Sequence, residues 1–385
     1  MKVMRPRRPS RRNGARPLSL VVIGGGNIGS QLLPLLAHLP GLDPLTIIDD
    51  DSYGPENIPT QAITGADVGR PKAIVQAERL RAMRPDLRAI PLVEKVETVP
   101  LGRLQADLIL TCVDSRAARL WVNRAAHHLG IPWIDAGVEP ERMLCRVSVY
   151  IPAEDAACME CTWDEESYAL VEAVNPCGAG GPAEASTNAP SCLGAAAASL
   201  QAIECRKLLA GHEAALPGGG EVLLDTLHHH LYSTANRRNG ECRCDHAPWR
   251  IETLDRGAAE LTLGELAGLA ATCDGDVDGI SLEVPGQRFA RRLCCPECFT
   301  DSRTTVLAGR LTGSTAACPR CGDDMVPQGF SLEERLRLDD HPSGPTATLA
   351  SLGCLPGDVI GMRTGAGVRR FLLPLDEEDR RKETP

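Results

Sequence analysis

Apolar and amphipathic stretches alternate along the first part of the chain. The continuous apolar run from Leu18 to Ile23 predicts a buried strand, and the helical pattern of residues 30–39 follows it. Further strands are expected at 45–48, 89–93, 108–112 and 133–136, and helices at 72–83 and 115–129. Strands and helices that alternate over this length predict an α/β fold with a doubly wound, mostly parallel sheet.

The alternation ends after residue 163. Residues 164–190 are rich in Gly, Pro, Ala and Asn, a composition that predicts a long loop. A helix is then expected at 191–210, and strands at 221–224 and 228–233. The first domain is therefore expected to end near residue 248.

Beyond residue 248 the pattern predicts smaller modules. Thr262 and Glu265 have the spacing of a capping box at the start of a short helix. Apolar runs at 280–284 and 287–293 flank Pro285-Gly286, which predicts a β-hairpin. We expect four parts in the chain: a basic tail at 1–17, the α/β domain at 18–248, a ribbon region at 249–328 and a small mixed module at 329–385.

Charge is distributed unevenly along the 385 residues. Residues 1–17 hold seven Lys or Arg and no acid, whereas the net charge of the chain is −10, so the remainder sums to −17. The tail is expected to be a disordered, solvated arm; an arginine near its end that folds over a phosphate site is the alternative. The acidic body argues against nucleic acid as a partner.

Apolar residues nowhere form a run of the roughly 20 that span a bilayer. The first residues also lack the apolar core of a signal peptide. We therefore expect a cytoplasmic protein without a membrane partner.

The first expected strand runs directly into the sequence GGGNIG. In this G-x-G-x-x-G spacing, Gly24 permits the tight turn, Gly26 lets the backbone approach a phosphate, and Gly29 allows close helix packing. The helix N-terminus would supply N–H donors to the phosphate. An acid about 20 residues further on, here Asp49, suits a ribose hydroxyl. By itself this arrangement indicates a nucleotide, with NAD as the default.

Sixteen cysteines are many for a protein in a reducing compartment, where metal sites or a reactive thiol explain them better than disulfides. Two CxxC pairs follow the expected hairpin, Cys295 with Cys298 and Cys318 with Cys321. This spacing is typical of a zinc ribbon. Four thiolates leave no open position on the metal, so the expected role of this zinc ion is structural.

Further motifs appear in a fixed order within residues 18–248. They are GGGNIG, Asp49 and Asp51 in a D-x-D pattern, Asn57, V-G-x-P-K ending at Lys72, and Asp114 followed by Arg119. Together they resemble the ThiF/MoeB family, the bacterial relatives of ubiquitin-activating enzymes. The resemblance implies a homodimer that uses ATP and Mg²⁺ to adenylate the C-terminal carboxylate of a small ubiquitin-like or sulfur-carrier protein.

The resemblance also implies roles for single residues. Asp49 would hold the ATP ribose, Lys72 the phosphates, and Asp114 the Mg²⁺ beside the α-phosphate. An attacking carboxylate and a triphosphate repel each other, so a lysine and Mg²⁺ must neutralise the developing charge.

One position departs from the family pattern. Thr60 stands where the family usually has a phosphate-binding arginine, three residues after the asparagine. Arg16, Arg70 and Arg116 are the candidate substitutes, because a guanidinium binds phosphate oxygens bidentately. Family members often borrow such an arginine from the N-terminal segment of a dimer partner, and Arg16 lies just before the first strand.

A second zinc ion is implied by the resemblance. Its ligands would be two distant cysteine pairs, Cys158 with Cys161 and Cys242 with Cys244. Four soft ligands suit tetrahedral Zn²⁺. The second pair is CxC rather than CxxC, so His246 is the alternative to Cys244 as the fourth ligand.

Some enzymes of this family transfer the activated partner to their own cysteine as a thioester. Cys177 lies in the expected loop where those members carry theirs, and a thioester there would pass the partner to a downstream conjugating protein. Cys192 is the competitor, because a helix N-terminus stabilises a thiolate. A loop cysteine without a function is the remaining alternative.

Three other functions stay open. A sulfur-carrier activator would adenylate its partner without a thioester, although no rhodanese-like domain is visible. A dinucleotide-dependent oxidoreductase would use the glycine turn, but Lys72, Asp114 and the paired cysteines disfavour it. A non-catalytic binding scaffold is favoured only by Thr60.

Overall fold

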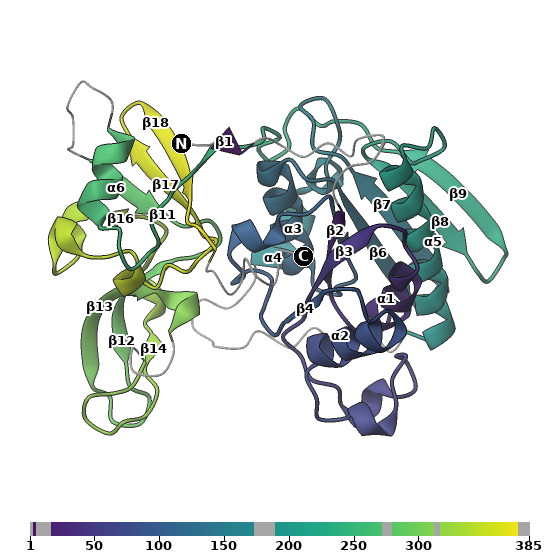
Figure 1. Ribbon diagram of the computed structural model, residues 1–385, viewed down its shortest axis with the longest axis horizontal. Helices are drawn as coiled ribbons and strands as arrows, with labels where there is room; N and C mark the ends of the chain where they lie inside the picture. Colours follow the sequence, from purple (N-terminus) through teal and green to yellow (C-terminus); the bar gives the residue numbers. More distant parts are fainter. Residues whose placement is uncertain (1–2, 5–16, 173–188, 272–278, 312–315, 376–385) are drawn as a thin grey trace. The chain divides into compact units, whose positions relative to one another are not determined.

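The computed structural model describes residues 3–4, 17–172, 189–271, 279–311 and 316–375 (Figure 1). The chain forms two compact units. We call Pro6–Val96 with Leu104–Trp249 the α/β unit, and Met1–Arg5, Glu97–Arg103 and Arg250–Pro385 the C-terminal unit.

One eight-stranded sheet forms the centre of the α/β unit. Its strands lie in the order β4 (Ala89–Leu92), β3 (Leu42–Ile48), β2 (Leu18–Ile23), β5 (Leu108–Thr111), β6 (Trp133–Glu139), β7 (Leu144–Tyr150), β8 (Gly220–Asp225) and β9 (His230–Ala235). Neighbours from β4 to β6 are parallel, and β7, β8 and β9 continue the sheet antiparallel. The predicted mostly parallel sheet is confirmed.

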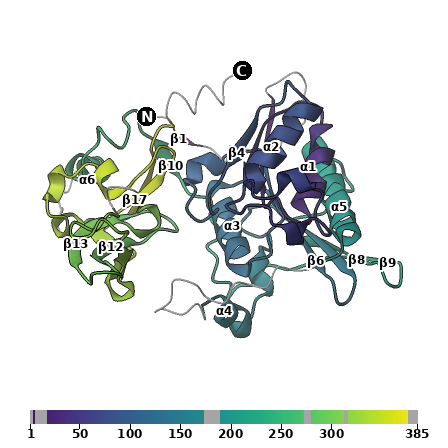
Figure 2. The ribbon, with the colours of Figure 1, turned by 90° about the horizontal axis from the view of Figure 1, so that it is seen from below.

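Helices cover both faces of this sheet (Figure 2). The helices of one face are α1 (Gly29–Ala37), α2 (Lys72–Met83) and α5 (Ser191–Ala210), and the opposite face carries α3 (Arg116–Leu129). Right-handed crossovers explain the division. The chain moves one way through the sheet from β2 to β3 and β4, and the other way from β5 to β6, so α3 falls on the other face. The sheet is therefore doubly wound.

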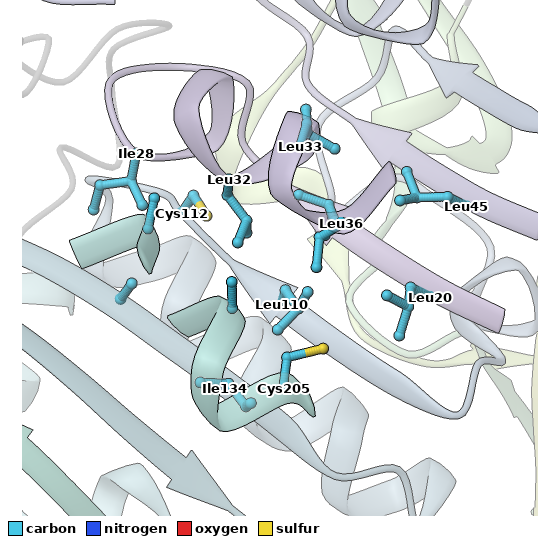
Figure 3. Close-up of a cluster of buried hydrophobic side chains, with 14 of the residues drawn as sticks. Leu20, Ile28, Leu32, Leu33, Leu36, Leu45, Leu110, Cys112, Ile134 and Cys205 are labelled. Carbon is cyan, nitrogen blue, oxygen red and sulfur yellow. The ribbon is translucent and has the colours of Figure 1, made fainter. Parts of the chain in front are cut away.

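Leucines of the strands and of α1 form the main core of this unit (Figure 3). Leu20, Leu45 and Leu110 point from the central strands toward Leu32 and Leu36 of α1, and all five are almost fully buried. The core also contains three cysteine thiols, those of Cys112, Cys145 and Cys205. Burial raises the pKa of Cys145 to about 11 and that of Cys205 to about 12, so these thiols are inert packing groups.

A short helix occupies the start of the segment that was expected to be a loop. Residues Glu165–Glu172 form α4. Its first turn is capped by Asp164, whose Oδ1 accepts hydrogen bonds from the backbone N–H (2.8 Å) and hydroxyl (2.7 Å) of Ser167. The expectation of a continuous loop from residue 164 was therefore wrong, because it overlooked this D-x-x-S cap. Residues 173–188 lie outside the described part of the chain.

The C-terminal unit contains two small sheets. The first is six-stranded, in the order β1 (Val3–Met4), β10 (Ile251–Thr253), β18 (Gly367–Leu372), β17 (Val359–Thr364), β11 (Ser281–Glu283) and β16 (Leu336–Arg337). The second joins β12 (Phe289–Cys294) to β13 (Asp301–Leu307), β14 (Val326–Pro327) and β15 (Leu332–Glu333). A common core runs from Leu254 to Leu373, so both expected C-terminal modules contribute to it.

The capping box correctly predicts α6, the α-helix found among the described residues of this unit. The Thr262 hydroxyl accepts from the N–H of Glu265 (3.3 Å), and α6 spans Leu263–Ala270. The predicted hairpin around Pro285-Gly286 is wrong, because β11 pairs with β16 and β17 while β12 pairs with β13. The turn is present, with the Gln287 N–H donating to the Val284 carbonyl (3.0 Å), but it carries the chain from one sheet to the other.

In the part of the chain that the structure describes, no helix combines the length and apolar character needed to cross a membrane.

A buried ion pair connects the two sheets of the C-terminal unit. Arg310 follows β13 and forms a two-pronged pair with Asp358, which precedes β17; one of its two contacts measures 2.7 Å. Both side chains are almost completely buried, with 7% and 2% of their surface exposed. At this depth, removal of either partner leaves the other charge buried without compensation, which strongly destabilises the fold.

Removal of the Arg310 guanidinium should destabilise the C-terminal unit. Arg310→Met would leave the Asp358 carboxylate buried without its charged partner, which costs about 3–5 kcal/mol. Native-state hydrogen exchange of the β17 amides measures this cost. Arg256→Met is the control, because the Arg256–Glu265 pair is exposed to solvent and should contribute little to stability. Equal protection of β17 in the two variants would contradict the prediction.

Candidate functional site

A glycine turn connects β2 to α1 at the carboxyl end of the parallel strands. Gly24 has φ +97°, and a β-carbon on it would lie 2.7 Å from the carbonyl oxygen of Cys112. A β-carbon on Gly29 would lie 1.9 Å from the Gly24 carbonyl oxygen. Both positions therefore require glycine. At Gly26 the space is open, with only the Gln61 side chain at 3.9 Å, which leaves the backbone accessible to a ligand.

Asp49 follows β3 and braces this turn. Its Oδ2 accepts a hydrogen bond from the Gly25 N–H (2.6 Å), and its Oδ1 accepts one from the Asp51 N–H (2.9 Å). Burial raises the pKa of Asp49, while Lys72 and the two N–H donors act in the opposite direction. The predicted site residues Asp49 and Asp51 are thus placed directly beside the glycine turn.

Lys72 is the first residue of α2 and lies among acidic groups. Its Nζ pairs with Asp51 Oδ2 at 2.9 Å, and only 11% of its side-chain surface is exposed. Burial lowers the pKa of this amine, but three nearby carboxylates outweigh burial and raise it. They are those of Asp49, Asp51 and Asp114. Lys72 is therefore a cation at neutral pH, in a site that can bind further positive charge.

Asp114 lies on the loop between β5 and α3. Its side chain is exposed, and among the described residues its carboxylate makes no hydrogen bond. The helix is capped by the next residue instead, because the Ser115 hydroxyl accepts from the Ala118 N–H (3.3 Å). Asp114 is therefore not needed as a helix cap, and its oxygens are available to a hard cation such as Mg²⁺.

Two buried residues that support the turn were missed from the sequence. The Tyr53 hydroxyl donates to the Gly25 carbonyl (2.7 Å) and accepts from the Gln76 side chain (2.7 Å). Burial raises the pKa of Tyr53, so it remains a neutral donor. Gln76 lies four residues after Lys72 on α2, a spacing that places both on one helix face and could have identified it.

Residue 60 is an uncharged threonine, so it cannot supply the positive charge of the phosphate-binding arginine that the family usually has there. The neighbouring Asn57 is buried and its Oδ1 accepts from the Gly54 N–H (2.8 Å), which stabilises the local turn. Of the candidate arginines, Arg70 is paired with Glu78 (2.7 Å). Arg116 makes no hydrogen bond or ion pair with any described residue, and Arg16 lies outside the described residues.

The first cysteine cluster joins segments that are far apart in the sequence. Cys158 directly precedes a single turn, Met159–Thr162, and Cys161 lies within it; both face Cys242 and His246. The potential ligand atoms lie within 4.8 Å of one another, including 3.6 Å between the sulfurs of Cys158 and Cys242. Cys244 is buried beside them, but its sulfur is not one of the four. The structure thus places the alternative ligand, His246, rather than Cys244, beside Cys158, Cys161 and Cys242.

The second cluster lies where the hairpin of β12 and β13 meets β14. Its members are Cys295, Cys298, Cys318 and Cys321. The sulfurs of Cys295 and Cys321 are 3.4 Å apart, and those of Cys298 and Cys318 are 3.5 Å apart. Hydrogen bonds to Thr300 lower the pKa of Cys298 to about 6, and backbone N–H groups of the knuckle lower the pKa of Cys318. These bonds favour the thiolate at Cys298 and Cys318, which is the form that binds a metal. The pKa of Cys321 is raised instead: a backbone hydrogen bond at Asp323 lowers it, but the neighbouring Cys295 and Cys298 outweigh that bond.

The candidate nucleophiles are placed only in part. Cys177 lies outside the described residues. Cys192 is the second residue of α5, and its thiol is exposed.

The fold and the glycine turn are those of an α/β protein that binds a nucleotide at the carboxyl ends of its strands. Residues 9–245, more than half of the chain, match the model of the ThiF family. The chain belongs to the ThiF family.

Curated relatives carry related names. The sulfur carrier protein ThiS adenylyltransferase of Escherichia coli (strain K12) is 29% identical over 229 residues, which cover 58% of this chain and 84% of the relative. The ubiquitin-like modifier-activating enzyme 5 of Oryza sativa subsp. japonica is 29% identical over 162 residues, or 38% of each chain. The adenylyltransferase and sulfurtransferase UBA4 of Yarrowia lipolytica is 31% identical over 43% of this chain and 41% of its own length. The match thus spans less than half of the last two relatives.

Solved structures with a similar fold include E. coli MccB with ATP. The TM-score is 0.48 at 20% identity, over 59% of this chain and 65% of MccB.

The identity of the fourth ligand in the first cluster can be tested by metal content. We expect His246→Ala to lower the bound metal from about two ions per chain to about one, because three remaining ligands hold a structural metal poorly. Cys244→Ser should leave the content unchanged. Elemental analysis of both purified variants provides the measurement. The opposite result would return the fourth position to Cys244.

Proposed function

We propose that this chain uses ATP and Mg²⁺ to adenylate the C-terminal carboxylate of a small ubiquitin-like or sulfur-carrier protein. The observation that carries the proposal is the charged Lys72, held among three carboxylates beside a glycine turn. A lysine suits phosphate oxygens, and the carboxylates suit Mg²⁺ and a ribose. One relative is named for a sulfur-carrier protein and another for a ubiquitin-like modifier, and both names support this chemistry.

In this proposal each part of the site has one task. The turn around Gly26 binds phosphate through backbone N–H groups, Asp49 binds the ribose, and Lys72 binds phosphate oxygens. Asp114 would hold Mg²⁺, which when bound would supply positive charge to the phosphates of ATP. The partner's carboxylate oxygen attacks the α-phosphorus, the bond to the β-phosphate oxygen breaks, and pyrophosphate leaves. The products are an acyl adenylate and pyrophosphate.

The missing phosphate arginine is assigned to Arg16 of a second copy of the chain in a cytoplasmic homodimer. Arg116 is the alternative within the same chain, because it lies two residues after Asp114 and is unpaired among the described residues. Arg70 is the weakest candidate, since Glu78 already holds its guanidinium.

Both cysteine clusters are proposed to bind zinc with a structural role. The three sulfurs and the imidazole of the first cluster, and the four sulfurs of the second, are donors that Zn²⁺ prefers. Thiols must lose their protons to bind zinc, so metal affinity should fall as the pH falls.

A competing function uses the same turn. A dinucleotide oxidoreductase also needs a G-x-G-x-x-G turn and an acid after the second strand. It has no use for a lysine and a free carboxylate at Lys72 and Asp114, whereas adenylation needs both. A scaffold without activity would retain the fold but would not exchange pyrophosphate.

Pyrophosphate exchange tests the proposed reaction. Asp114→Ala should lower the rate of ATP–pyrophosphate exchange by about 100-fold or more, because it removes charge stabilisation from the transition state. Asp86→Ala removes an exposed carboxylate in the turn that follows α2 and serves as the control with an unchanged rate. Calorimetric titration of the wild-type chain should show tighter binding of ATP with Mg²⁺ than of NAD. Tighter binding of NAD than of ATP with Mg²⁺ would contradict the proposed adenylation.

A thioester on Cys177 is the second part of the proposed reaction. The thiolate would attack the acyl carbon of the adenylate, and AMP would leave. We expect an ATP-dependent adduct with the partner that a thiol reductant removes. Cys177→Ala should lose this adduct but keep pyrophosphate exchange, because adenylation comes first. Loss in Cys192→Ala instead would assign the nucleophile to α5, and an adduct in neither wild type nor variants would end the reaction at the adenylate.

A further inference from the structure

A buried carboxylate, Asp135, joins arginines from two different elements. Asp135 lies on β6 and has no exposed surface. Its Oδ1 accepts hydrogen bonds from Nε of Arg119 (3.1 Å) and from the Thr111 hydroxyl (2.7 Å). Its Oδ2 accepts one from Arg146 (2.8 Å). Both carboxylate oxygens are therefore used by protein donors.

Arg119 extends this network to the loop that carries Asp114. While Asp135 holds its Nε, its two terminal nitrogens donate to the carbonyl oxygens of Val113 (2.5 Å) and Asp114 (3.4 Å). A guanidinium is planar and rigid, so these three contacts fix the orientation of two successive peptide groups. The direction of the Asp114 side chain depends on those peptide groups.

The other arginine does not reach this loop. Arg146, on β7, donates to the Ser148 hydroxyl (3.1 Å) and approaches the Glu221 carboxylate (3.5 Å). Burial lowers the pKa of Arg146, but Asp135 outweighs burial and raises it, so the guanidinium stays charged. The two arginines share one buried carboxylate, and only Arg119 holds the loop of Asp114. Arg146 therefore has a structural role only, whereas Arg119 can also position Asp114.

We infer that Asp135 and Arg119 are positioning residues for adenylation: Asp135 orients Arg119, and Arg119 holds Asp114 where it binds Mg²⁺ beside ATP. The inference rests on the proposed function, which assigns the Mg²⁺ to Asp114. Neither residue contacts the nucleotide in this scheme. Their effect should appear as a change in the Mg²⁺ requirement of ATP binding.

The test compares Arg119→Lys with Arg146→Lys in the full chain. Lysine keeps the positive charge beside Asp135, but it is a point charge on a flexible stem without a rigid planar fork, so it cannot fix Asp135 and the two carbonyls in one defined geometry. ATP is titrated calorimetrically at a series of Mg²⁺ concentrations, with Asp114→Ala as the reference for complete loss. In Arg119→Lys the Mg²⁺ concentration for half-maximal binding should rise about tenfold, equivalent to about 1.4 kcal/mol. In Arg146→Lys it should equal that of the wild type.

Thermal unfolding of the same two variants controls for a purely structural role. Both should lose similar stability, since both weaken the same buried network. Equal Mg²⁺ shifts in the two variants, or no shift in Arg119→Lys, would overturn the inference and leave the adenylation proposal standing. A wild-type chain that binds no ATP in the presence of Mg²⁺ would overturn the proposed function, and the inference with it.

Asp135→Asn tests the other half of the inference. With both arginines in place, this variant should show the same Mg²⁺ shift as Arg119→Lys, because Arg119 loses the charge that orients it. A Mg²⁺ requirement like that of the wild type would remove Asp135 from the inference.

Discussion

The candidate site depends on one close approach of backbone to backbone, between Gly24 and Gly29. A side chain at residue 29 would collide with the Gly24 carbonyl oxygen and push α1 away from β2. The same turn presents the Gly25 N–H to Asp49 and the Gly25 carbonyl to Tyr53. A change in this turn would therefore displace groups that arrive from β3 and from the loop before α2. The geometry of the whole site follows from the absence of two side chains.

Around that turn, charge is arranged for binding rather than for stability. Lys72 faces three acidic groups, so the site holds more negative charge than its own cation neutralises. Like charges in a partly buried place raise the free energy of the folded state unless a ligand cation compensates them. The network around Asp135 has the opposite character, because its carboxylate lies between Arg119 and Arg146. The first arrangement needs a partner, and the second supports the loop beside it.

Local signals in the sequence predicted much of the α/β unit. Helices α2 and α5 begin and end at the predicted residues, because a proline precedes each of them and the apolar pattern is continuous. Strand partners in the C-terminal unit could not be predicted in this way. β11 pairs with β17, about 80 residues later, and no local pattern encodes that choice over the nearby β12. Asp135 was missed for the same reason, since its partners lie on other elements.

The first cysteine cluster has a consequence for the end of the α/β unit. Every residue of β9 is exposed, and between His230 and Trp249 only Cys244 and His246 are buried. This segment therefore gains very little from apolar burial, and bonds from Cys242 and His246 to a metal shared with Cys158 would supply most of the free energy that holds it. A metal ion placed there closes the unit by coordination at a point where the hydrophobic core does not extend. The ribbon cluster, by contrast, adjoins buried side chains of its own sheet. Loss of metal should therefore release residues 230–249 at the end of the α/β unit before it unfolds the small sheet that carries the ribbon cluster.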